Sequence, residues 1–104
     1  MASLEYTTGL AINKARQSHC RYKISAIGLD KSGNVIGSAC NKKRFNYEGG
    51  GVHAEMALLR KYGKKIKSMV ICRVNKEGNL LKINSCKTCQ KTLDNLGIKV
   101  YSIW

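Results

Sequence analysis

The chain has 104 residues, enough for one compact domain spanning residues 1–104 and too few for a second. Hydrophobic residues make up 43% of it, which suffices for a globular core. No apolar run reaches the length of a membrane span, and residues 1–9 lack the apolar region of a signal peptide. We therefore expect a soluble, cytoplasmic protein with no membrane partner.

The charge of the chain is strongly positive. Lys and Arg number 19 against six acids, for a formal net charge of +13. Such an excess attracts polyanions, including nucleic acid, phosphorylated metabolites and acidic membrane surfaces, and charge alone does not choose among them. The five cysteines, an odd number, do not form the even framework of a small secreted domain, so reduced thiols are expected.

The first half of the chain predicts a helix, a β-hairpin and a polar loop. A helix is indicated by apolar or small residues that lie on one stripe at helical spacing: Leu4, Thr8, Ala11, Ile12 and Ala15. Ser3 is its candidate N-cap. Residues 22–29 and 35–40 are mostly apolar β-type runs on either side of a turn signal at 30–34, which is typical of a hairpin. Residues 41–51 are polar and end in three glycines.

The second half predicts helices alternating with strands. A helix is expected over about 52–62, with Gly63 just past its end, followed by a buried strand at 69–72. A turn at 75–79 precedes a short strand over 80–83 that pairs back on the strand before it. Cys89, Leu93 and Leu96 share a face of a last helix, which Gly97 ends before a final strand at 98–103. The order predicts an α/β fold with a parallel crossover and a mixed four- to five-stranded sheet.

Two short motifs carry the chemistry. His53 and Glu55 follow three glycines at the start of one helix, and Cys86 and Cys89 lie at the start of another. One imidazole and two thiolates bind tetrahedral Zn²⁺ and leave its fourth position open, as in a catalytic site. Taken singly, the motifs have plainer interpretations: a core or surface histidine, and a redox Cys-x-x-Cys pair. The redox motif usually follows an early strand, whereas this pair comes late in the chain.

With His53, Glu55, Cys86 and Cys89 in this order, the chain resembles the zinc-dependent cytidine and deoxycytidylate deaminase superfamily, whose signature is His-x-Glu followed by Pro-Cys-x-x-Cys. It departs from the signature at Ser85, where proline is usual. Serine can cap the helix instead, so zinc binding should survive the change. The resemblance implies a helix/sheet/helix layered cytidine deaminase-like fold and a tendency to form homo-oligomers.

The resemblance also implies roles for individual residues. His53, Cys86 and Cys89 would hold Zn²⁺, and Glu55 would move protons between the attacking water and the base. Glu55 has a plainer interpretation as favourable charge at a helix N-terminus, worth about 0.3–1 kcal/mol. That interpretation does not explain why it lies beside a histidine of the metal-binding type.

Candidate substrate-binding residues lie in and next to the polar loop. Asn41 resembles the family's asparagine that binds the sugar, although a turn asparagine is equally consistent with its position. Lys42 and Arg44 are candidates for holding a phosphate, and the alternative is a solvated charged loop. Ala54, between the histidine and the glutamate, is also included in the substrate-binding set.

The sequence thus predicts hydrolytic deamination of a cytosine base, in cytidine, CMP or dCMP, to uracil with release of ammonia. One alternative is a deaminase that acts on cytosine or adenine in RNA or single-stranded DNA. Another is a non-catalytic, zinc-stabilised module that binds nucleic acid, against which the intact Glu55 argues. The free nucleotide is preferred because basic residues are scattered along the chain rather than gathered in one loop.

Overall fold

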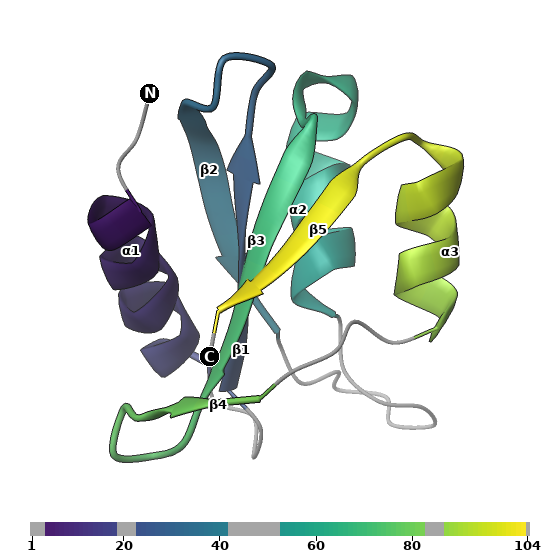
Figure 1. Ribbon diagram of the computed structural model, residues 1–104. Helices are drawn as coiled ribbons and strands as arrows, with labels where there is room; N and C mark the ends of the chain where they lie inside the picture. Colours follow the sequence, from purple (N-terminus) through teal and green to yellow (C-terminus); the bar gives the residue numbers. More distant parts are fainter. Residues whose placement is uncertain (1–3, 19–22, 42–52, 83–86, 104) are drawn as a thin grey trace.

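The computed structural model describes residues 4–18, 23–41, 53–82 and 87–103, arranged as a sheet between two helical layers. Helix α1 covers one face of the sheet, and α2 and α3 lie on the other (Figure 1). This arrangement confirms the α/β layered fold. The elements are α1 (Leu4–Arg16), β1 (Lys23–Leu29), β2 (Val35–Cys40), α2 (Ala54–Tyr62), the 3₁₀ helix η1 (Gly63–Lys65), β3 (Ser68–Val74), β4 (Leu80–Leu81), α3 (Lys87–Asn95) and β5 (Lys99–Ile103).

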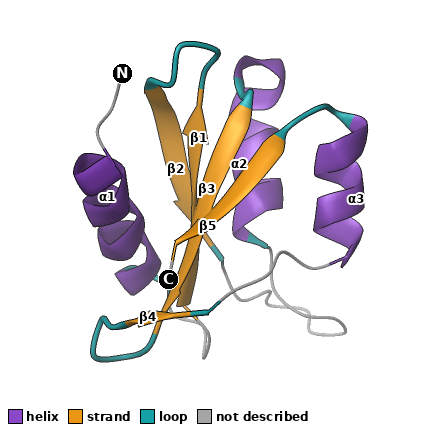
Figure 2. Ribbon diagram, in the orientation of Figure 1, coloured by secondary structure: helices purple, strands orange, loops and turns teal. Residues whose placement is uncertain are grey.

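Strand β3 lies at the centre of the mixed sheet. It pairs antiparallel with β1, which pairs in turn with β2 to make the expected hairpin. Along its other edge, β3 pairs in parallel with β5 over Ser68–Cys72 and antiparallel with β4 at Arg73 and Val74. Figure 2 shows β3 between β1 and β5. The parallel crossover and the short returning strand were both expected, although Ile83 lies outside the described residues.

Alternate residues of the central strands build two cores, one on each face of the sheet. The core under α1 contains Ala11, Ala15, Ile27, Val70, Cys72 and Val74. The core under α2 and α3 includes Leu58, Ile66, Met69, Ile71, Leu93 and Ile98. Because β3 faces a core on both sides, its sequence is a continuous apolar run rather than an alternating one. Pairing with β1 extends it to Ser68–Val74, beyond the expected 69–72.

Four small residues of the hairpin lie beneath α2. Ala26 is paired with Ala39 and Gly28 with Gly37, so two adjacent cross-strand pairs contribute almost no side-chain bulk on this face. A Cβ added at Gly37 would lie 2.4 Å from the ring of Tyr62, and one at Gly28 would lie 3.2 Å from Ile66 and Leu58. The glycines therefore allow α2 and the segment after it to approach the sheet closely.

The end of α3 differs from the sequence expectation. The helical spacing predicts that Leu96 shares a helical face with Cys89 and Leu93, but the helix ends at Asn95 and Leu96 is 60% exposed. The Gly97 N–H bonds to the Asp94 carbonyl at 3.1 Å and the Ile98 N–H to the Leu93 carbonyl at 2.9 Å, with Gly97 at a φ of 73°. These bonds form a Schellman motif that turns the chain and places Ile98, rather than Leu96, against Leu93.

Two of the cysteines are buried and free, as expected for reduced thiols: Cys40 and Cys72. The Ser25 hydroxyl donates to the Ala11 carbonyl at 2.6 Å and lies 3.3 Å from the Cys72 sulfur, which ties α1 to the sheet. Burial raises the pKa of the Cys72 thiol, so this group stays protonated and plays a packing role. No helix in the described part of the chain has the length and apolar character needed to span a membrane.

We expect Gly37→Ala to destabilise the fold by about 1–3 kcal/mol, because the new methyl group overlaps the Tyr62 ring. Gly9→Ala is the matched control: a Cβ at Gly9, in the middle of α1, meets nothing within 4 Å. There the substitution should stabilise by up to about 1 kcal/mol through helix propensity. Urea unfolding of both variants measures the difference, and equal stabilities would show that α2 does not depend on the glycine.

Candidate metal centre

The two helices that carry the predicted metal ligands begin at the same end of the molecule. α2 starts directly after His53, and α3 starts directly after Cys86. Each helix runs back along the sheet, so both N-termini lie at the end to which β2 and β3 lead (Figure 1). Both motifs therefore lie at helix starts, as the sequence predicted.

His53 occupies the N-cap position of α2. Its backbone is extended (φ −72°, ψ 145°), and its carbonyl accepts the first hydrogen bond of the helix, from the Ala57 N–H at 3.0 Å. The side chain makes no cap hydrogen bond and is exposed. Because His53 is exposed at the start of the helix, it is not a core histidine.

Glu55 lies in the first turn of α2 and is only 4% exposed. Carboxylates are seldom buried to this extent, because the charged form loses its hydration. A capping role alone would leave the side chain in solvent, so burial of Glu55 favours a function that requires it there.

Ala54 is fully buried and belongs to the core under α2. Its side chain packs against the sheet, so any contact with a substrate would use its backbone. It is the first residue of the helix, where backbone N–H groups have no intrahelical acceptor.

Asn41 directly follows β2, and its hydrogen bonds link the end of this strand to Ser18 after α1 and to β1. Its side-chain oxygen accepts hydrogen bonds from the Ser18 hydroxyl at 2.7 Å and from the Ile24 N–H at 3.0 Å. The Asn41 N–H donates to the Ile24 carbonyl at 3.0 Å. These contacts fix the orientation of the amide. No sequence signal marks Ser18 for this role, since a serine near a helix end does not reveal that it will meet a residue 23 positions away.

The remaining predicted site residues lie wholly or partly outside the described residues. These are Lys42, Arg44 and Cys86, together with Ser85 of the signature and the side chain of Cys89. The described side chains contain no cluster of three potential metal ligands. The fit to zinc therefore depends on the donor set, one imidazole and two cysteine sulfurs at neighbouring helix starts, which is the set that zinc prefers.

A family model described as the cytidine and deoxycytidylate deaminase zinc-binding region matches residues 1–103. The chain belongs to this family. The match covers nearly the whole chain. A search of curated proteins found no match.

Solved cytidine deaminases share the fold of this family member. The enzyme from Mycobacterium tuberculosis has a TM-score of 0.65 at 20% identity, with 96% of this chain and 85% of that chain covered. The enzyme from Mycobacterium leprae has a TM-score of 0.67 at 15% identity, with 96% and 87% covered. The enzyme from Burkholderia pseudomallei has a TM-score of 0.68 at 15% identity, with 92% and 78% covered. At these identities the likeness establishes the fold alone.

We expect the purified deaminase-family chain to carry about one zinc ion, and Cys86→Ser and Cys89→Ser each to lose it and to melt at a lower temperature. Cys72→Ser is the control for zinc content, because it makes the same change in the core beneath α1, on the other face of the sheet. Elemental analysis and thermal melting measure both effects. Unchanged zinc content in either of the two ligand variants would remove that cysteine from the ligand set.

Proposed function

We propose that this chain is a zinc-dependent hydrolase that deaminates the cytosine base of a free nucleotide, CMP or dCMP, to the uracil form with release of ammonia. The observation that carries the proposal is the buried carboxylate of Glu55, two residues after His53 in the first turn of α2. Membership of the deaminase family supplies the reaction class.

His53, Cys86 and Cys89 are the residues that would hold the metal. A zinc ion with three protein ligands and an open position supplies Lewis-acid activation of water at neutral pH. The position of Cys86 and Cys89 at the N-terminus of α3 supports this set, because the positive end of a helix lowers the pKa of nearby thiols and favours thiolates.

Glu55 would act as the proton carrier. It accepts a proton from the water that attacks the amidine carbon of the base, and it delivers protons to the ring nitrogen and then to the departing amine. The carbon–nitrogen bond breaks, and ammonia leaves. Burial supports this role because a carboxylate shielded from bulk water exchanges protons with the substrate rather than with solvent.

The substrate would be positioned by groups at the same end of the molecule. The Ala54 N–H, at the first position of α2, is suited to a carbonyl oxygen of the base. Asn41, whose amide is fixed by Ser18 and Ile24, is proposed to contact the sugar. Lys42 and Arg44 follow Asn41 in the chain and are proposed to bind the phosphate.

The arrangement of charge favours a free nucleotide over a polynucleotide at this site. The densest run of basic residues in the described part of the chain, residues 60–67, lies at the far end of α2 from His53 (Figure 1). A large share of the net charge therefore lies away from the candidate metal centre. A single phosphate needs only one or two cations beside Asn41.

We expect Glu55→Gln to keep zinc and fold while lowering the deamination rate by at least about 10², because an amide cannot carry protons. Glu77→Gln, which changes an exposed acid in the turn between β3 and β4, is the matched control and should leave the rate unchanged. Ammonia release from cytidine, CMP and dCMP measures the rates. A Glu55→Gln variant that works near the original rate would exclude Glu55 as the proton carrier.

We expect replacement of Lys42, Lys43 and Arg44 by alanine to raise KM for CMP or dCMP at least about tenfold, since a charge-assisted hydrogen bond to phosphate contributes about 1.5–3 kcal/mol. KM for unphosphorylated cytidine should change little. Steady-state kinetics on the nucleoside and the nucleotide separate the two effects. Equal rises for both substrates would contradict phosphate binding by this loop.

A further inference from the structure

The end of the molecule opposite the candidate metal centre is strongly basic. Helix α2 begins after His53 at one end of the sheet and reaches Gly63 at the other (Figure 1). In the sequence, no acidic residue occurs between Glu55 and Glu77. Five of the eight residues from 60 to 67 are basic, and all five are exposed: Arg60, Lys61, Lys64, Lys65 and Lys67.

Backbone hydrogen bonds bring two further lysines to this end. The Lys67 N–H donates to the Leu29 carbonyl at 2.8 Å, which places the β1–β2 turn and its exposed Lys31 beside the run. The Lys99 N–H donates to the Lys67 carbonyl at 3.5 Å, which places the first residue of β5 there as well. We define the basic end as the side chains of Lys31, Arg60, Lys61, Lys64, Lys65, Lys67 and Lys99.

Few acids oppose this charge. In the described part of the chain, the acids near the basic end are Asp30 and Asp94. The Asp30 carboxylate accepts the N–H groups of Ser32 and Asn34, each at 2.9 Å, so it is engaged within its own turn. Seven cations therefore face two carboxylates, and the basic end carries a net positive potential.

Stabilisation of α2 explains only part of the cluster. Arg60 and Lys61 lie in the last turn of the helix, where each cation contributes about 0.3–1 kcal/mol through the dipole. That effect falls off within a turn. Lys31, Lys67 and Lys99 lie in strands, connections and turns, so they receive no such benefit, and their mutual repulsion destabilises the fold.

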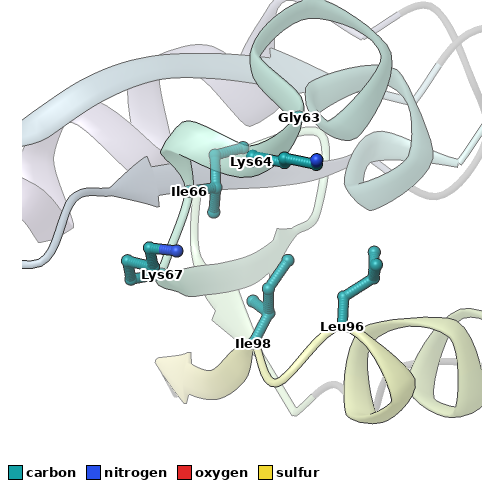
Figure 3. Close-up of a pocket in the computed structure, with 6 residues that line it drawn as sticks. All are labelled: Gly63, Lys64, Ile66, Lys67, Leu96 and Ile98. Atoms are coloured by element: carbon teal, nitrogen blue, oxygen red, sulfur yellow. The ribbon is translucent and has the colours of Figure 1, made fainter.

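A small cavity opens among these lysines. It has a volume of about 130 Å³ and lies between η1 and the turn after α3. Its apolar lining is Ile66, Leu96 and Ile98, and its rim carries Lys64 and Lys67 (Figure 3). The hollow is open to solvent on one side, and most of the apolar surface that it presents belongs to Leu96, because Ile66 and Ile98 are buried. The exposed Leu96, released from α3 by the Schellman motif, forms one wall.

We propose that the basic end binds a single-stranded polynucleotide, with the lysines contacting successive phosphates and one unstacked base resting on the exposed side chain of Leu96. A repeating anion suits seven cations spread over several elements, and an exposed apolar side chain among them suits an unpaired base. An anionic membrane is a poorer match, because Leu96 is the one large apolar side chain exposed here and the surface around it is concave.

This binding is separate from the proposed deamination. Nine residues of α2 separate the two ends, a rise of roughly 13 Å. Binding at the basic end should therefore persist in Glu55→Gln, and its presence or absence does not decide whether the candidate metal centre is active.

The test is fluorescence anisotropy of the full zinc-loaded chain with a labelled single-stranded oligothymidylate, titrated between low and moderate salt. The combined variant Lys64→Ala, Lys67→Ala, Lys99→Ala should bind at least about tenfold more weakly and reduce the logarithmic salt slope by about 2, at about 0.7 per lost phosphate contact. The matched control, Lys14→Ala, Arg16→Ala, Lys76→Ala, removes three charges near the end of α1 and in the β3–β4 turn. It should weaken binding less than about threefold.

A second pair of variants changes Leu96 in the cavity wall, an exposed residue that is not part of the core. Leu96→Asp places a negative charge in its wall and should weaken binding more than the neutral, similarly shaped Leu96→Asn. Equal weakening by the two triple variants would overturn the proposal, because binding would then depend on total charge alone. So would a duplex bound as tightly as the single strand, or binding to anionic vesicles without binding to the oligonucleotide.

Discussion

The close approach of α2 to the β1–β2 hairpin is the constraint on which the rest of the structure depends. Two cross-strand pairs of small residues, Ala26 with Ala39 and Gly28 with Gly37, lie beneath the helix. Leu58, Tyr62 and Ile66 fill the space that larger side chains would occupy. A helix seated on so little side-chain bulk cannot slide or tilt without losing contact along its length. Its first turn, which carries Glu55, is fixed to the sheet by the buried Ala54.

This packing also explains which parts of the fold could be predicted from the sequence. The apolar runs of β1, β2 and β3 and the helical stripe of α1 predicted those elements, because burial on one or both faces imposes a period on the residues themselves. The pairing of Gly28 with Gly37 cannot be predicted from the hydrophobic pattern of either strand. It depends on the geometry of the hairpin turn, which determines which residues of β1 and β2 lie opposite each other. Leu96 was misplaced for a related reason, since a helical spacing does not reveal the residue at which the chain turns away.

The candidate site was predictable to the extent that it depends on local sequence. His53 and Glu55 were selected as candidates because metal binding and proton transfer would need such residue types at the start of a helix, and the start of α2 was predictable from the sequence. Ser18 was not, because its contact with Asn41 joins segments 23 positions apart. The gathering of Lys31, Lys67 and Lys99 was equally hidden: along the sequence these basic residues look scattered, and only pairing of β1, β3 and β5 brings them together.

Topology places the candidate metal centre and the basic end at opposite ends of α2. Because α2 and α3 each return along the sheet before the next strand, their N-termini share one end of the molecule, whereas the end of α2 and the starts of β3 and β5 share the other. The Debye length is about 8 Å at physiological ionic strength, shorter than the roughly 13 Å rise of α2, so exposed charges at one end of the helix act only weakly through solvent on an exposed ligand at the other end. The two ends of α2 therefore lie far enough apart for the proposed deamination and the proposed polynucleotide binding to be independent of each other.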